Sequence, residues 1–220
     1  MEAAECIKTR RSIRKFKSEP VPKGVLMEVI DIARWSPSYK NSQPWEVAVV
    51  SGTKKEALSG LLIELLESGR EKDPDLPEPK FWPDPEGQRI TELIEQRKAA
   101  LGIDLSDPEV IRQARMANFK FYGAPHVIYL YQDSSLSLWS LFDLGLFAQS
   151  LMLAAHDKGL GTVPQGFVTD YAAEVKRFLA IPESKRLVLG LSIGYPDLED
   201  RVNKLRTERG AVPEFVNWLE

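Results

Sequence analysis

Apolar residues recur at the spacing of an amphipathic helix in several parts of the chain. The segments with this pattern are 22–36, 57–66, 88–101, 107–119 and 138–155. Pro22 suits the first turn of its helix because its missing N–H would be unpaired there, and Asp107 is a typical helix cap. The last segment is apolar at nearly every position, so we expect a helix that is buried on all sides.

Three shorter runs are rich in β-branched and aromatic residues, which is typical of strands. They cover residues 45–50, 126–132 and 187–195. Helices and a few separated strands, without a regular alternation of strand and helix, predict an α+β fold. With 220 residues, the chain is expected to form a single domain over 1–220.

The proline-rich segment 71–87 interrupts this pattern and excludes a regular helix or strand. It also carries Phe81 and Trp82, large apolar groups that a plain linker rarely contains. Together with the two helices that follow, it forms what we call the excursion, at about residues 70–120. We expect the excursion to lie over the core of the single domain.

Charge and composition narrow the function classes. The 29 Lys and Arg against 32 Asp and Glu give a net charge of −3, unlike a protein that binds nucleic acid over a broad surface. The single cysteine, Cys6, and the distant His126 and His156 offer no spacing for a metal site. The first residues lack the apolar stretch of a secretory signal, and no transmembrane segment is expected, so we expect a cytoplasmic protein.

Residues 8–17, KTRRSIRKFK, concentrate six basic side chains in this acidic chain. Arg10, Ser12 and Arg14 share one side if the segment is extended, and Arg10 and Arg14 still share a face if it is helical. Two guanidiniums and a hydroxyl suit a phosphate group. A solvated basic turn is the alternative, and the sequence has no glycine-rich phosphate-binding turn.

A second candidate is GLGTVPQGF, residues 159–167. Pro164 has no N–H, whereas Gln165 and Gly166 offer successive backbone donors, which glycine could help to aim together. Such donors could meet the N5 and O4 edge of a flavin. An ordinary tight turn is the alternative.

Five motifs occur in an order that resembles the nitroreductase family of FMN-dependent oxidoreductases over essentially the whole chain. They are RRSIRKF, SPSYKNSQPWEVAVV, NFKFYGAPHVIYLY, GLGTVPQGF and VNKLRTERGAVPEFVNW. The proline-rich stretch and the two helices after it resemble the branch that includes nitrobenzoate reductases. The resemblance implies a central antiparallel sheet flanked by helices and a homodimer with FMN at its interface.

The resemblance also implies a set of FMN-binding residues and no catalytic side chain or metal. The set is Arg10, Arg11, Ser12, Arg14, Pro37, Ser38, Tyr39, Asn41, Pro164, Gln165, Gly166, Arg206 and Arg209. Arg10 and Ser12 would hold the phosphate, and Arg14 would lie near the pyrimidine edge and stabilise the reduced flavin. Residues 37–41 would come from the other subunit. Many relatives have glutamate in place of Gln165.

Arg206 and Arg209 would close on the phosphate, with exposed helix-end charges as the alternative reading. A further family contact could fall at Asn118, where the excursion leaves the match open.

The activity implied is an NAD(P)H oxidoreductase that reduces nitroaromatics, quinones or similar flat acceptors by ping-pong hydride transfer. Phe81 and Trp82, with Phe119 or Phe121, would form an apolar wall for the acceptor. The alternatives are other flavin chemistry, such as dehalogenation or dehydrogenation, and a non-catalytic flavin-binding or redox-sensing module. A dimer whose basic segment docks an acidic partner is a further alternative.

Overall fold

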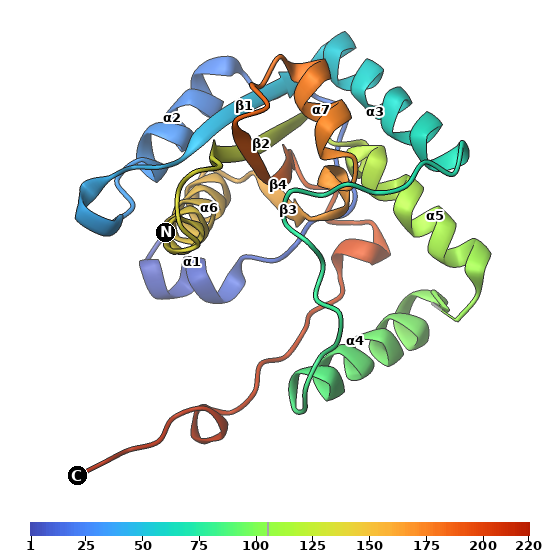
Figure 1. The fold of residues 1–220 in the computed structure, drawn as a ribbon. Coiled ribbons are helices and arrows are strands. Elements are labelled where there is room, and N and C mark those ends of the chain that lie inside the picture. Colours follow the sequence, from blue (N-terminus) through green and yellow to red (C-terminus); the bar gives the residue numbers. More distant parts are fainter. Residues whose placement is uncertain (105) are drawn as a thin grey trace.

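A computed structural model describes residues 1–104 and 106–220 of the chain. Its centre is an antiparallel sheet with the strand order β1-β2-β4-β3 (Figure 1). The strands are β1 (Glu46–Ser51), β2 (His126–Asp133), β3 (Gly161–Gln165) and β4 (Lys185–Gly194). Glu46 pairs with Tyr131 across β1 and β2, and β3 pairs with β4 at the sheet's other edge.

Helices cover both faces of this sheet (Figure 1). They are α1 (Ala3–Thr9), α2 (Lys23–Ala33), α3 (Gly52–Glu67), α4 (Glu86–Leu101), α5 (Pro108–Phe119), α6 (Trp139–Asp157) and α7 (Ala172–Leu179). Ile128 and Leu130 of β2 point into one core with α2 and α6. Val127 and Tyr129 point the other way, into a core with α3, α5 and α7. Alternate residues of a strand face opposite sides, so one strand serves two cores.

The α+β fold is confirmed, and so are the three predicted strands and the five predicted helices. Asp107 caps α5 as expected, because its carboxylate accepts a hydrogen bond of 2.8 Å from the N–H of Glu109. The sequence interpretation missed β3 and the short helices α1 and α7. The glycine and proline in β3 conceal its strand character, although an edge strand tolerates proline.

Helix α6 is not buried on all sides within one chain. Its inner positions, among them Leu151 and Ala155, are fully covered. At its start, by contrast, Leu138, Trp139 and Phe142 are 72%, 71% and 64% exposed. A large apolar surface therefore lies at the N-terminal end of α6.

The excursion begins as an irregular segment that is bonded to the main body. Asp75 accepts hydrogen bonds from the ammonium of Lys176 at 2.8 Å and from the N–H of Leu187 at 2.7 Å. Helix α4 then lies apart from the sheet, near the segment that leads to the C-terminus (Figure 1). In the described part of the chain, no helix is sufficiently long and apolar for a membrane crossing.

The end of the excursion belongs to the core. Phe119 and Phe121 are fully buried between the sheet and its helices, so neither can form a wall for an acceptor. That part of the expected apolar wall is wrong. Phe81 and Trp82 remain exposed, at 75% and 54%.

Candidate functional site

The basic segment that follows α1 lies along the free edge of the sheet. Ser12 bridges to Thr162 of β3, and the N–H of Ile13 donates to the carbonyl of Thr162 at 2.9 Å. Gly161 makes this approach possible, because a Cβ atom there would lie 2.7 Å from Cγ1 of Ile13. Glycine in a strand commonly marks such a close approach of backbone.

Asn203 fixes the other end of the same segment. Its Oδ1 accepts from the N–H of Arg14 at 2.7 Å, and its Nδ2 donates to the carbonyls of Lys15 and Asp197 at 2.8 and 2.7 Å. The side chain is almost fully buried, at 1% exposure. The segment is therefore held through its backbone, which leaves the arginine side chains available for a ligand.

These side chains line a cavity of about 480 Å³, which we call the cation cavity. Its basic lining residues are Lys8, Arg10, Arg11, Arg14, Arg97, Arg206 and Arg209. Ser12, Thr207 and a few apolar side chains complete the lining, and no acidic residue is among the described residues that line it. The cavity thus joins the two ends of the chain and helix α4 around a space suited to an anion.

Arg10 is the side chain that most clearly lacks a partner. Its Nε and Nη1 atoms are buried and make no hydrogen bond with any part of the chain that the structure describes. Burial lowers the pKa of its guanidinium, and the nearby charge of Arg209 lowers it further. Buried guanidinium N–H groups without acceptors are costly, so Arg10 favours an anionic ligand at this position.

Other arginines of the cavity are also partly buried beside a charge of the same sign. Burial lowers the pKa of Arg11, with a further contribution from Arg206. For Arg97, burial is again the first cause and the charge of Arg14 the second. An anion with more than one charge would relieve several of these interactions at once.

Arg206 and Arg209 approach from the C-terminal segment. Both are exposed, as the alternative reading expects, but neither lies at the end of a helix. Arg206 Nη1 donates to the carbonyl of Thr9 at 3.2 Å, which ties this segment to the end of α1. Arg209 Nη1 donates to its own loop, including the hydroxyl of Thr207 at 2.8 Å. Both side chains line the cation cavity.

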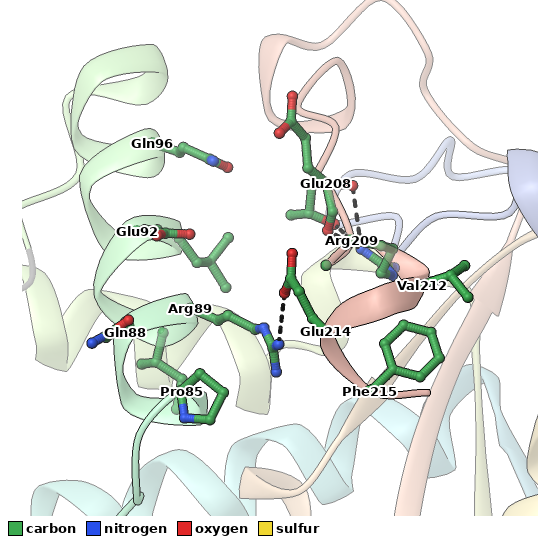
Figure 2. Close-up of a pocket in the computed structure, with 14 residues that line it drawn as sticks. Pro85, Gln88, Arg89, Glu92, Gln96, Glu208, Arg209, Val212, Glu214 and Phe215 are labelled. Atoms are coloured by element: carbon green, nitrogen blue, oxygen red, sulfur yellow. Dashed lines mark hydrogen bonds and ion pairs between the residues drawn. The ribbon is translucent and has the colours of Figure 1, made fainter. Parts of the chain in front are cut away.

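A second cavity, of about 1020 Å³, adjoins the first between α4 and the C-terminal segment. Figure 2 shows Arg89 of α4 and Glu214 of that segment pointing toward one another, and their ion pair spans 3.2 Å. Arg201 Nη2 also donates to the carbonyl of Leu101 at the end of α4, at 3.0 Å. These contacts hold α4 beside the cation cavity.

Pro164, Gln165 and Gly166 do not form the expected turn. Pro164 and Gln165 are the last residues of β3, and Gly166 has φ −68° and ψ −43°, which any residue can adopt. The glycine is therefore not needed for an unusual backbone conformation here. Pro164 and Gln165 lie on the same strand as Thr162, and Gly166 follows it, but none of the three lines the cation cavity.

The side chain of Gln165 is a buried hydrogen-bonding centre, at 2% exposure. Its Nε2 donates to the carbonyl of Asn118 at 3.0 Å and to Oδ1 of the same residue at 3.2 Å. Its Oε1 accepts from the hydroxyl of Ser192 on β4. Gln165 thus connects the end of β3 to Asn118 of the excursion.

Residues 37–41 form a separate loop that includes the 3₁₀ turn Tyr39–Asn41. Lys40 and Asn41 have φ values of 52° and 57°, an uncommon conformation for residues other than glycine. The N–H of Tyr39 donates to Asp143 of α6 at 3.1 Å. Pro37, Ser38, Tyr39 and Asn41 do not line the cation cavity of their own chain.

The structure therefore brings six of the predicted residues together, namely Arg10, Arg11, Ser12, Arg14, Arg206 and Arg209. The sequence interpretation missed Lys8, Arg97 and Asn203. Lys8 was visible within the basic cluster, and Arg97 could have been found from the leucines four residues before and after it. Among the described residues, no three His, Cys, Asp or Glu side chains are grouped to hold a metal ion.

Comparisons with known proteins show which family the chain resembles in sequence and in fold. The model of the nitroreductase family matches residues 7–195. A 4-nitrobenzoate reductase of Pseudomonas putida is 34% identical over 217 residues, which cover 97% of this chain and 93% of that protein. The crystal structure of the FMN-dependent nitroreductase NfnB from Mycobacterium smegmatis in complex with NADPH has a TM-score of 0.94 at 31% identity, covering 99% of this chain and 98% of that one. An FMN and NADPH-dependent NfnB from Sphigopyxis sp. strain HMH has a TM-score of 0.96 at 30% identity, covering 100% of both chains.

Proposed function

The chain belongs to the nitroreductase family, and on that premise we propose that it is an FMN-dependent NAD(P)H oxidoreductase that reduces nitroaromatic compounds. The observation that carries the proposal is the cation cavity, in which side chains from both ends of the chain surround the unpaired guanidinium of Arg10. The similarity to a 4-nitrobenzoate reductase supports the nitrobenzoate reductase-like branch.

The residues of the cavity fit the phosphate of FMN. Arg10 and Ser12 would hold it, and Arg206 and Arg209 would close on it from the C-terminal segment. The buried, unpaired N–H groups of Arg10 would gain phosphate oxygens as acceptors. Charge-assisted hydrogen bonds of this kind are about twice as strong as neutral ones.

We further assign the flavin ring to the neighbouring elements. Arg14 would stabilise negative charge at its pyrimidine edge, and the backbone N–H groups of Gln165 and Gly166 would face its N5 edge. The loop with Pro37, Ser38, Tyr39 and Asn41 would reach the ring from a second subunit. The loop does not line the cation cavity of its own chain, and it is bonded to α6, which supports a role across an interface.

Bound FMN would supply hydride transfer between a reduced nicotinamide and an electron-poor acceptor. The chain's part is to bind the cofactor, to place donor and acceptor in turn on one face, and to hold fixed positive charge beside it. A single shared position predicts ping-pong kinetics. Phe81 and Trp82 remain as candidates for the apolar surface that receives the acceptor.

We propose a homodimer as the functional unit. Leu138, Trp139 and Phe142 form an exposed apolar surface at the start of α6, which a second copy would cover. Tyr39, whose side chain is also exposed, donates its backbone N–H to Asp143 of the same helix. We place this dimer in a reducing cytoplasm, where the free thiol of Cys6, buried beneath α6, would stay reduced.

The test begins with the protein as purified. Heat should release FMN, identified by its absorbance and its mass, and light scattering should give the mass of a dimer. Anaerobic NADPH or NADH should bleach the flavin, and 4-nitrobenzoate should restore its colour. Initial rates at several concentrations of both substrates should give parallel double-reciprocal lines.

Different outcomes separate the alternatives. A protein that binds no FMN would refute the proposal. FMN binding without steady NAD(P)H oxidation in the presence of nitroaromatics would favour a non-catalytic module or another flavin chemistry, such as dehalogenation. Two-electron reduction of a nitro group consumes one NAD(P)H and one proton and releases one water, so product analysis checks the assignment.

A further inference from the structure

Arg97 occupies an unusual position on α4. The inner positions of this helix are otherwise apolar: Ile90, Leu93, Ile94 and Leu101. Arg97 lies in this stripe, one helical turn from Leu93 and one from Leu101, and is half-buried. An amphipathic helix normally keeps its charges on the outer face, as α4 does with Lys98. A charge at this inner position is unfavourable unless an anionic ligand or an acidic partner binds it.

Within the described chain, Arg97 has no acidic partner. The other basic side chains of α4 are paired: Arg89 with Glu214 at 3.2 Å and Lys98 with Asp104 at 2.8 Å. Arg97 instead lines the cation cavity, where burial and then the charge of Arg14 lower the pKa of its guanidinium. A half-buried charge beside another of the same sign is unfavourable without a counter-ion.

The phosphate of FMN accounts for only part of the positive charge. It carries close to two negative charges at neutral pH, while seven basic side chains line the cavity. The proposed phosphate ligands come from the N-terminal and C-terminal segments, and Arg14 is assigned to the flavin ring. Arg97 reaches the cavity from α4, a third element, and remains without an assigned anion.

We propose that Arg97 determines specificity by binding a carboxylate on an aromatic acceptor, an inference that rests on the proposed function. A guanidinium binds a carboxylate through two parallel N–H donors. Leu93 and Leu205 line the same cavity and offer apolar surface for an aromatic ring. These side chains therefore suit an aromatic compound with one carboxylate better than a neutral nitroarene.

The test compares two acceptors, 4-nitrobenzoate and its neutral methyl ester, with the FMN-loaded enzyme. The variants are Arg97→Met, which removes the charge, and Arg97→Lys, which keeps the charge but loses the paired donors. Lys98→Met is the matched control, because it removes a neighbouring charge from the outer face of the same helix. Binding of unreactive benzoate, followed through the flavin absorbance, gives a readout that does not depend on turnover.

We expect Arg97→Met to lower the ratio of kcat/KM for the acid to that for the ester by roughly 10- to 100-fold, as for loss of a charged hydrogen-bonding partner. Benzoate affinity should fall by a similar factor. Arg97→Lys should be intermediate, and Lys98→Met should leave the ratio within about twofold of the wild type.

Other outcomes overturn the assignment. An unchanged ratio in Arg97→Met, or an equal loss for both acceptors, would exclude carboxylate recognition. Loss of FMN would place Arg97 in the cofactor site, and a raised KM for NADPH alone would assign it to a phosphate of the dinucleotide. A wild-type protein that binds no FMN, or reduces neither acceptor, would instead refute the proposed function.

Discussion

Replacing Gln165 with glutamate would put a titratable carboxyl group into the buried contact between β3 and the excursion. The Nε2 atom of Gln165 donates to two oxygens of Asn118, at 3.0 and 3.2 Å. A carboxylate oxygen in that place would face two acceptors. The side chain of Asn118 could turn, at the expense of its bond to Ala114, but its backbone carbonyl could not. The neutral acid, by contrast, can donate one hydrogen bond to that carbonyl.

The expected loss in the free energy of unfolding follows from the pKa of the new carboxyl group. Burial raises the pKa of a carboxyl, and for a site as covered as Gln165 a rise of roughly 3 units is reasonable. Because the folded-state pKa is raised, the variant loses stability as pH increases above the unfolded value near 4.3. The loss would be about 1 kcal/mol at pH 5 and about 4 kcal/mol at pH 8.

Thermal melts of the FMN-free protein between pH 5 and 8 measure this loss. For a domain of this size, the difference in Tm between Gln165→Glu and wild type should widen by on the order of 10 °C over that interval. Gln165→Met is the control: it removes the hydrogen bonds to Asn118 and Ser192 but has no titratable group. Its deficit should be nearly constant with pH. Melting curves of Gln165→Glu that parallel those of the wild type would refute the network as described.

Three further predictions concern the edge of the sheet, a titratable group and the excursion. Gly161→Ala should drive Ile13 away from β3 and lower both FMN affinity and stability, the latter by about 1–3 kcal/mol; unchanged melts and FMN titrations would contradict the close approach. Burial and nearby arginines lower the pKa of His156, so protonation favours the unfolded chain; His156→Gln should reduce the loss of Tm that FMN-free protein shows as pH falls from about 7 to 5. An equal loss in both proteins would refute that role. Trp82→Ala should raise the KM of aromatic acceptors several-fold, and an unchanged KM for every acceptor would exclude Trp82 from the acceptor site.

The elements that the sequence predicted are those whose apolar pattern is long enough to be recognised. Helix α5 has both its apolar stripe and its cap, whereas α7 has eight residues and α1 has seven with a single buried side chain, Cys6. Strand β3 has five residues, among them a glycine and an exposed proline. Its strand character comes from pairing with β4, which is a tertiary effect.

Some residues of the cation cavity could likewise be predicted from the sequence, and others could not. The basic cluster at residues 8–17 is visible in the sequence, but its meeting with Arg206 and Arg209 joins positions almost 200 residues apart and follows from the family resemblance alone. The role of Asn203 could not be predicted, because nothing in the local sequence shows that its amide would reach Arg14 and Lys15. Arg97 was overlooked because an arginine within an amphipathic helix is usually taken as part of its exposed face.

The bonds that hold the basic segment also determine what binding an anion can contribute. The backbone N–H groups of Ile13 and Arg14 donate to the carbonyl of Thr162 and the side chain of Asn203, so the segment's position does not depend on its guanidinium groups. Arg10 and Arg11 consequently stay close to like charges and partly removed from water, which opposes folding of the FMN-free chain. An anion that binds only the folded chain removes this penalty, and the free energy of its binding adds directly to stability. The close approach at Gly161 and the amide of Asn203 therefore hold the arginines of the cation cavity in place without neutralising the charges that an anion requires.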